Sequence, residues 1–317
     1  MKIAALALRG TTQWPGLQAG ALDAGLNVFH GPPASGKTAL ADLIGHALCG
    51  RRIPAADGVQ LQPPEGELVV ECEGRRFRLR RKADPTSAGR LTVAGLDGVV
   101  GVDRDTVHRL TYGVSPSLLA PLYVLNFREP LRLEWLLSER FAQEFRTFFP
   151  RRRWHGNRPA SSFLAQLTHG DLLRLRITHP KRRTVVVHRA GRVLPVESLA
   201  PIERDSVYLS LCFALVSAFR RQGIELPLVL DEPFVRLDRR ATVALIETLC
   251  ELGRNGQQAL VFTARQEAAE RFAELGATMH DMTRLREPNE EPTLAVVAEA
   301  KTQAETSTHK RKRRRAG

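Results

Sequence analysis

The sequence contains no long hydrophobic run. None of its apolar stretches approaches the roughly 18 residues that a bilayer-spanning helix requires. The apolar residues 3–8 are too few for the core of a secretory signal peptide. These absences argue against a membrane-spanning and a secreted protein, and we expect a cytoplasmic one.

Cysteine is scarce. The four cysteines, Cys49, Cys72, Cys212 and Cys250, stand at least 23 positions apart, with neither CxxC spacing nor a nearby histidine pair. This pattern excludes a disulfide scaffold and a cysteine-ligated metal site, and it predicts buried free thiols.

Lysine is also scarce, with seven residues among 47 basic ones in a chain whose net charge is +13. Residues 301–317 carry seven basic side chains against Glu305, so the tail alone contributes +6 and the rest of the chain +7. A GC-rich coding sequence produces the same surplus of arginine over lysine. The charge by itself therefore does not establish nucleic-acid binding, although the tail could bind any polyanion.

The hydrophobic and charged fractions, 43% and 26% of 317 residues, are those of a globular protein with one large domain or two modest ones. Apolar runs, alternation and helical periodicity predict its elements. Strands are predicted at residues 3–8, 26–30, 91–95, 226–230 and 259–263, hairpins at 67–82 and 172–189, and helices at 38–48, 131–149, 207–221, 239–252 and 266–275. Residues 151–162 are predicted as a loop, and residues from 288 onward as disordered. Apolar strands separated by helices indicate an α/β fold with a mainly parallel sheet plus antiparallel β-hairpins.

A phosphate-binding pattern lies between the second predicted strand and the first predicted helix. Glycines at such a turn allow backbone N–H groups to surround phosphate oxygens at the positive end of a helix. The lysine reaches the β- and γ-phosphates, and the threonine hydroxyl binds Mg²⁺. The pattern G-x-x-x-x-G-K-[ST] is matched in full by Gly31, Pro32, Pro33, Ala34, Ser35, Gly36, Lys37 and Thr38.

Two carboxylates follow the apolar strand predicted at residues 226–230. Asp231 stands where a P-loop protein places the carboxylate that holds the water shell of its magnesium ion, and Glu232 is next to it. A carboxylate beside the metal can accept a proton from an attacking water. We predict Lys37, Asp231 and Glu232 as catalytic residues, and Thr38 and Asp231 as metal ligands. A structural carboxylate at Glu232 is the alternative interpretation.

Together these motifs resemble the ABC-class ATPase heads of the SMC, RecF and SbcC type, in particular the YhaN-like branch. The similarity covers most of residues 1–285: residues 228–234 are similar to the family's Walker B motif, and Leu237-Asp238 to its D-loop. The resemblance implies a P-loop NTPase, a two-lobed ABC/SMC-type head with ATP and Mg²⁺ as cofactors. It places Asp238 near the nucleotide of a partner head.

The chain departs from this family at several positions. Leu199-Ala200-Pro201-Ile202-Glu203 stands where the family has a Leu-Ser-x-Gly-Thr signature, so the serine and glycine are missing. Arg265 replaces the histidine that follows the next strand, and could contact phosphate without shuttling a proton. Residues 102–114 contain no glutamine for a Q-loop. The long coiled coil is absent, because only about 80 residues, roughly 90–170, are available to hold a helical remnant.

The resemblance also implies a division of the chain into lobes. We expect an N-terminal lobe with Walker A, a helical insert in place of the coiled coil, a C-terminal lobe with signature, Walker B and D-loop, and a disordered basic tail. These are residues 1–114, 115–160, 161–287 and 288–317.

Two functions remain open. The first is an ATPase head that hydrolyses ATP slowly and dimerises with a copy of itself or a related head. The second is a hydrolysis-deficient switch or scaffold for a partner protein. A small-molecule kinase or an AAA-type remodeller is disfavoured, because Lys37 and Asp231 lie 194 positions apart.

Further partners suggested by the resemblance are a nuclease subunit and DNA, with a role in DNA repair or maintenance. Phosphate contacts would come from the arginine clusters Arg75-Arg76, residues 151–153 and residues 181–183. A solvated arginine surface is the alternative explanation of these clusters.

Overall fold

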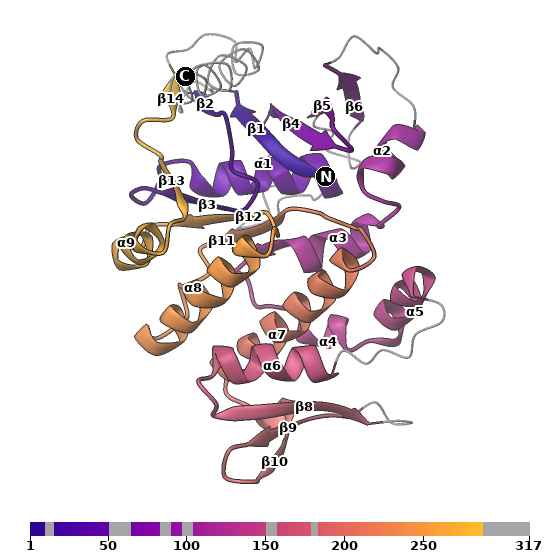
Figure 1. Cartoon of the computed structure of the whole chain (residues 1–317), viewed down its shortest axis with the longest axis vertical. Helices are drawn as coiled ribbons and strands as arrows, with labels where there is room; N and C mark the ends of the chain where they lie inside the picture. Colours follow the sequence, from indigo (N-terminus) through magenta and orange to yellow (C-terminus); the bar gives the residue numbers. More distant parts are fainter. Residues whose placement is uncertain are drawn as a thin grey trace, which may run out of the picture.

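The computed structural model describes residues 1–9, 16–50, 65–82, 90–96, 104–149, 157–178 and 183–287. The molecule is elongated, with an antiparallel sheet at one end, a parallel sheet beneath it, a layer of helices, and a small sheet at the other end (Figure 1).

The antiparallel sheet has six strands, which come mainly from the first hundred residues. In spatial order they are β14 (Arg286–Glu287), β2 (Gly16–Ala19), β1 (Lys2–Leu8), β4 (Gly66–Cys72), β5 (Arg75–Arg81) and β6 (Leu91–Gly95). The helix α2 (Arg104–Leu110) follows it along the chain.

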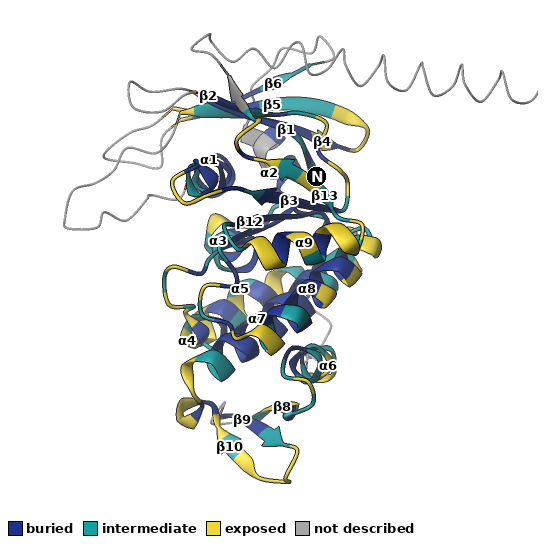
Figure 2. Ribbon diagram, turned by 90° about the vertical axis from the view of Figure 1, so that its left-hand side faces the viewer, coloured by how far each residue is buried: buried dark blue, intermediate teal, exposed yellow. Residues whose placement is uncertain are grey.

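The parallel sheet has five strands and lies in the middle of the molecule. Their order is β13 (Thr278–Asp281), β3 (Leu26–His30), β12 (Ala259–Thr263), β11 (Leu228–Asp231) and β7 (Val124–Asn126). All residues of β11 and β12 are buried, as their apolar sequences require in a sheet covered on both faces. The helix α1 (Lys37–Cys49) lies between the two large sheets, while α8 (Arg239–Arg254) and α9 (Gln266–Glu274) cover the opposite face of the parallel sheet (Figure 2).

The remaining helices surround α7 (Pro201–Arg220), which is buried along most of its length. They are α3 (Pro116–Tyr123), α4 (Leu133–Leu136), α5 (Glu139–Phe148) and α6 (Asn157–Leu167). Below α6 lies the third sheet, formed by β8 (Leu172–Thr178), β9 (Arg183–His188) and β10 (Val193–Pro195), and the short helix η2 (Val196–Ser198) connects it to α7.

Most predicted elements are confirmed, with three corrections. The helix expected at 131–149 is broken before Ser138, whose hydroxyl accepts the Phe141 N–H at 3.1 Å and caps α5. The segment 151–162 was expected as a loop, but α6 begins within it at residue 157. Pro159 does not prevent this helix, since it lies in the first turn, where proline is tolerated. The expectation of one mainly parallel sheet is too simple, since the larger sheet is antiparallel throughout.

The four cysteines are free and buried, as predicted. No helix in the described ranges has the length and apolar character to cross a membrane. The tail from residue 288, expected to be disordered, lies outside the described residues, and the division of the chain into lobes stays a prediction.

One glutamine side chain connects the two large sheets. Gln258, which is 2% exposed and precedes β12, accepts the Ile3 N–H of β1 at 2.7 Å and donates to the Ile3 carbonyl at 2.8 Å. It also donates to the Asp23 carbonyl at 2.9 Å. Because buried backbone groups need partners, this one side chain satisfies both polar groups of Ile3.

We expect Gln258→Ala to lower the free energy of unfolding by about 2–4 kcal/mol, because it leaves buried polar groups without partners. The urea midpoint measures the change. Gln222→Ala, at an exposed position after α7, is the control and should change stability by less than about 0.5 kcal/mol. Equal shifts in the two variants would show that Gln258 does not join the sheets.

Candidate nucleotide-binding site

The P-loop connects the carboxyl end of β3 to α1 and has the conformation that its glycines allow. Gly36 has φ +93°, and a Cβ there would lie 2.5 Å from the Leu17 Cδ1 of β2. A Cβ on Gly31 would lie 2.7 Å from the Cβ of Met282. Both glycines are therefore required because residues from other parts of the chain pack directly against the loop. Pro32, Pro33 and Ala34 are exposed at its rim.

Lys37 is turned back onto the loop that precedes it. Its Nζ donates to the Gly31 and Pro32 carbonyls at 2.9 and 2.8 Å and to the Ser35 hydroxyl at 3.4 Å. The side chain is 3% exposed, and Nζ lies 3.7 Å from the Glu232 Oε1 atom. Burial lowers the pKa of Lys37, whereas the negative charge of Glu232 raises it. The ammonium is thus held among P-loop groups of Gly31, Pro32 and Ser35. We call the loop formed by residues 31–38 the phosphate cradle.

Asp231 lies at the end of β11, beside the first turn of α1. The Thr38 hydroxyl donates to its Oδ1 atom at 3.4 Å, while its Oδ2 atom is buried without a hydrogen-bond partner. Burial raises the pKa of Asp231 to about 6, although the nearby Arg128 lowers it. A buried, unsatisfied carboxylate oxygen next to a threonine hydroxyl fits a magnesium ligand pair, so the predicted metal residues lie together.

Glu232 occupies a strained backbone position. Its φ is +51°, a left-handed conformation that costs a non-glycine residue of order 1–3 kcal/mol. The Glu232 N–H donates to the Phe262 carbonyl at 2.8 Å, and the Ala264 N–H donates to the Glu232 Oε2 atom at 3.2 Å. These contacts with β12 and its following loop hold the carboxylate toward Lys37.

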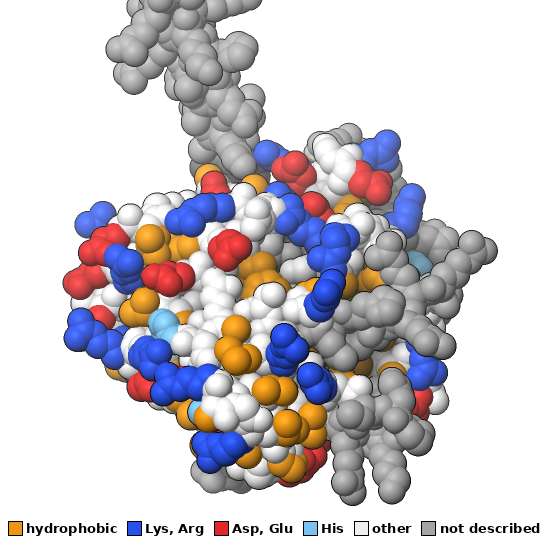
Figure 3. Space-filling view, turned by 60° about the horizontal axis from the view of Figure 1, so that its bottom comes forward, with side chains coloured by type: hydrophobic (Ala, Val, Ile, Leu, Met, Phe, Trp, Pro, Cys, Tyr) orange, Lys and Arg blue, Asp and Glu red, His pale blue; other side chains and the backbone are white. Residues whose placement is uncertain are grey.

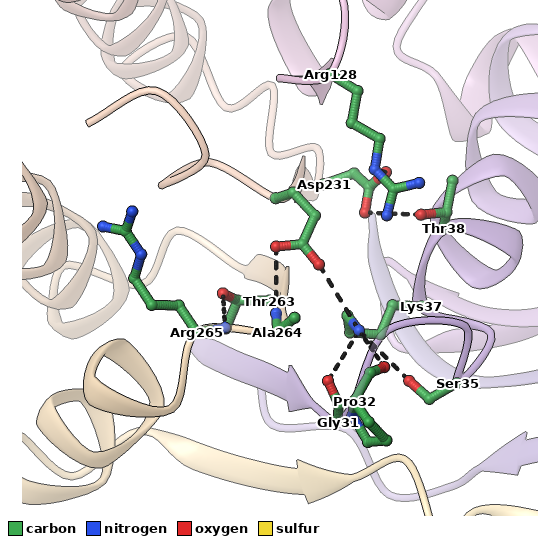
Figure 4. Close-up of polar contacts among 11 residues, drawn as sticks. Gly31, Pro32, Ser35, Lys37, Thr38, Arg128, Asp231, Thr263, Ala264 and Arg265 are labelled. Atoms are coloured by element: carbon green, nitrogen blue, oxygen red, sulfur yellow. Dashed lines mark hydrogen bonds and ion pairs between the residues drawn. The ribbon is translucent and has the colours of Figure 1, made fainter. Parts of the chain in front are cut away.

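Asp238 and Arg265 are not brought to this cluster. Asp238 caps α8 by accepting the Ala241 N–H at 2.7 Å. The Arg265 guanidinium donates to the Leu237 carbonyl at 3.3 Å and the Thr242 hydroxyl at 2.9 Å, and it points away from Lys37 (Figure 4). In this structure Arg265 fixes the loop before α8 and makes no contact with the phosphate cradle.

The N-terminus of α7 carries the altered signature. It is capped by the side chain of Glu203, a residue of the same helix. Ala200 is the cap residue and offers no side-chain acceptor, and Pro201 has no N–H. The Glu203 carboxylate accepts the Ala200 N–H at 2.9 Å. A helix N-terminus attracts anions through free N–H groups and its dipole, but here one donor is absent and a carboxylate is already present.

Arg128 is a site residue that the sequence did not reveal. It follows β7, a three-residue strand that pairs in parallel with β11, so the ends of the two strands meet at one edge of the sheet. The Arg128 Nε atom lies 4.0 Å from the Asp231 Oδ2 atom (Figure 4). The only sequence signal was the short apolar run before Asn126, which was too weak to predict a strand.

These features place a P-loop, two carboxylates and Arg128 at one edge of the parallel sheet. Solved structures identify the fold further as that of an SMC head. The SMC head domain from Thermotoga maritima shares 18% identity, with a TM-score of 0.56 over 89% of this chain and 94% of that chain. An Smc head bound to the C-winged helix domain of ScpA shares 19%, with a TM-score of 0.57 over 89% and 95%.

An Smc head domain with an extended coiled coil, bound to the C-terminal domain of ScpA derived from Pyrococcus furiosus, shares 15% identity, with a TM-score of 0.57 over 89% of this chain and 94% of that chain. No protein-family model and no curated protein matches the sequence. At these identities the likeness establishes the fold alone.

We expect Asp231→Asn to stabilise the metal-free protein by about 2–3 kcal/mol at pH 7.5. A carboxyl whose pKa is about 6 when folded and about 4 when unfolded binds its proton more tightly in the folded state, so ionisation opposes folding. The difference between the two proteins should therefore disappear as pH falls below about 4.

Urea unfolding in EDTA between pH 4 and 8 measures this difference. Asp238→Asn is the matched control, because asparagine caps a helix as well as aspartate does. A stability difference between Asp231→Asn and wild type that is independent of pH would contradict the raised pKa.

Proposed function

We propose that the protein is a MgATP-binding head of the ABC/SMC type that hydrolyses ATP slowly and couples nucleotide binding to association with a second head. The observation that carries the proposal is the convergence of Lys37 and Thr38, from the first turn of α1, with Asp231 and Glu232, at the end of β11.

The chain's own groups account for nucleotide binding. The backbone N–H groups of the P-loop and the positive end of α1 bind phosphate oxygens, and Lys37 turns from the Gly31 and Pro32 carbonyls to the β- and γ-phosphates. Thr38 and Asp231 would hold Mg²⁺. The bound ion would neutralise charge on the β- and γ-phosphate oxygens.

Glu232 is suited to the role of general base. Its carboxylate adjoins Lys37, which would contact the γ-phosphate, and the Ala264 N–H fixes its Oε2 atom. A water between the γ-phosphate and Glu232 would transfer a proton to the carboxylate as its oxygen attacks the γ-phosphorus, and the bond from that phosphorus to the bridging oxygen would break to release ADP. The strained φ of Glu232 supports a functional constraint on this position.

The closed N-terminus of α7 supports slow turnover. In a dimer of heads this end would face the nucleotide of the partner, yet it lacks a hydroxyl and presents the Glu203 carboxylate. The loss of one such transition-state donor typically costs about 3 kcal/mol, or about 100-fold in rate.

The same feature favours a second candidate function. If no head can complete the site of another, the protein is a hydrolysis-deficient switch whose ATP-bound state binds a partner protein. The anchoring of Arg265 to Leu237 and Thr242 fits this candidate, because it leaves the histidine position without a group at the phosphates.

The proposal also covers the partner of this protein, the branch of the family that it resembles and its cellular compartment. We propose a second copy or a related head as the main partner, with a nuclease subunit as a further candidate. The YhaN-like assignment rests on a resemblance over most of residues 1–285, which includes residues 1–49, residues 228–234 and Leu237-Asp238. Four buried cysteines that form no disulfide are consistent with the reducing cytoplasm.

We expect Lys37→Ala to abolish ATP binding, and Glu232→Gln to retain binding while hydrolysis falls at least about 100-fold. Steady-state phosphate release and equilibrium ATP binding measure the two effects. Glu270→Gln, at an exposed position on α9, is the control for loss of a carboxylate. ATP binding that survives in Lys37→Ala would contradict the proposed site.

The double variant Ala200→Ser/Ile202→Gly separates the two candidates. If two heads share the nucleotide, restoring the serine and glycine should raise the rate about 10- to 100-fold. If the rate stays at the background of Glu232→Gln, the switch is the correct function. Light scattering with and without ATP tests in parallel whether the heads associate.

We also propose DNA binding, at a surface that includes Arg174 and Arg176 of β8. Arg76 and Arg78 of β5 pair with Glu71 and Glu67, which weakens that cluster. By contrast, Arg174 and Arg176 of β8 are exposed and make no ion pair within the described ranges. Figure 3, in which this end of the molecule comes forward, shows basic side chains interspersed with hydrophobic ones. Residues 151–153, and residues 181–182 of the cluster at 181–183, lie outside the described residues.

We expect duplex DNA to bind with a salt-dependent affinity, and Arg174→Ala/Arg176→Ala to reduce the slope of log K against log salt by about 2. Fluorescence anisotropy between 50 and 200 mM salt measures the slope. Arg140→Ala/Arg146→Ala, which removes two paired arginines of α5, is the control. Absent or salt-insensitive binding would identify a merely solvated arginine surface.

A further inference from the structure

We propose that Arg128 is a nucleotide-contact residue that binds the γ-phosphate from within the same chain and so makes the protein prefer ATP to ADP. This inference rests on the proposed function and assigns the phosphate specificity of that site.

The backbone around Arg128 is fixed at three successive residues. The Phe127 N–H donates to the Asp231 carbonyl at 3.0 Å, and the Arg128 N–H donates to the Asn126 Oδ1 atom at 3.0 Å. The Glu129 carbonyl accepts from the Arg236 Nη1 atom at 3.1 Å. The base of the Arg128 side chain is therefore held at the edge of the site.

Arg236 connects this loop to the rest of the structure. Its Nε atom donates to the Asp205 Oδ2 atom of α7 at 2.9 Å while its Nη1 atom binds the Glu129 carbonyl. The loop that carries Arg128 is thus fixed both to β11 and to α7, the two elements on either side of it.

The Arg128 side chain is, by contrast, free to turn. It is 53% exposed, and its recorded partner in the described residues is Asp231, with 4.0 Å between the charged atoms, beyond hydrogen-bond distance. The guanidinium has five donors in a planar fork that fits phosphate oxygens. By contrast, the guanidinium groups of Arg236 and Arg265 donate hydrogen bonds to backbone carbonyls and side chains of the protein.

Arg128 also shares an electrostatic environment with Lys37. The positive charge of Arg128 lowers the pKa of Lys37 and that of Asp231. Two neighbouring cations repel each other, and an anion between them relieves the repulsion. A phosphate bound by Lys37 would therefore be attracted to Arg128 as well.

The place of Arg128 in the site indicates which phosphate it binds, namely the γ-phosphate. Thr38 and Asp231 define the expected metal position, which in P-loop proteins lies between the β- and γ-phosphates. Arg128 approaches Asp231 at its Oδ2 atom from the end of β7, whereas Lys37 is held by the P-loop carbonyls. The phosphate within its reach is the terminal one, which ADP lacks.

The test compares the affinities of Arg128→Ala and the wild type for ATP and for ADP by isothermal titration calorimetry, in the Glu232→Gln background so that ATP persists. We expect the affinity for ATP to fall about 10- to 100-fold, because one charge-assisted contact is lost. The affinity for ADP should change less than about threefold. Arg128→Lys should retain part of the preference, since it keeps the charge without the fork.

Arg132→Ala is the matched control, because it removes an exposed arginine of the same segment that makes no recorded contact with Asp231 or Lys37. It should change both affinities by less than twofold. Thermal unfolding should show that Arg128→Ala still folds, because the side chain is half-exposed.

An equal loss of ATP and ADP affinity in Arg128→Ala, or no loss, would overturn the inference. If Lys37→Ala then still abolishes binding of both nucleotides, the proposed nucleotide site stands and only the role of Arg128 is wrong. If the wild-type protein binds neither nucleotide, the proposed function fails and this inference fails with it.

Discussion

The burial of opposite charges at one edge of the parallel sheet is the constraint on which this structure depends. Lys37 and Asp231 are each about 3% exposed. Lys37 donates three hydrogen bonds to the P-loop, whereas the Asp231 Oδ2 atom has no hydrogen-bond partner to offset its removal from water. The strand order, with β12 between β3 and β11, brings them together from positions 194 apart. The free protein is therefore less stable than an apolar edge would make it, and a charged ligand removes that cost.

The second sheet shapes the site as well as covering α1. Leu17 of β2 packs where a Cβ of Gly36 would lie, and Met282 packs where a Cβ of Gly31 would lie. Gln258 joins β12 to β1 through both polar groups of Ile3. The phosphate cradle is thus enclosed by residues from both ends of the chain, so loosening the contact between the sheets would also loosen the cradle.

The sequence predicted the parts of the molecule that depend on local or regular patterns. The P-loop, the apolar strands β11 and β12 and the amphipathic helices α8 and α9 follow from spacing and burial, because these residues have one stable arrangement in an α/β fold. It did not predict β7, because three residues carry no periodicity and this strand exists only by pairing with β11. Arg128 was missed for the same reason, since its place in the site is set by a tertiary contact. The self-capping of α7 by Glu203 does not follow from the capping-box pattern, because Ala200 stands where that pattern has serine or threonine.

Under the proposed function, the two departures from a typical head would act on the same quantity, the positive potential around the terminal phosphate. Glu203 and Pro201 would remove the positive helix end that a second head contributes, whereas Arg128 would add a cation from the first. If both proposals are correct, the γ-phosphate is recognised mainly by groups of one chain and not by groups at the interface between two heads. Nucleotide selectivity would then no longer require a partner, and association would depend on the protein surfaces more than on a shared phosphate. A head of this kind could report on ATP while isolated, which a head that completes its site only in a dimer cannot do.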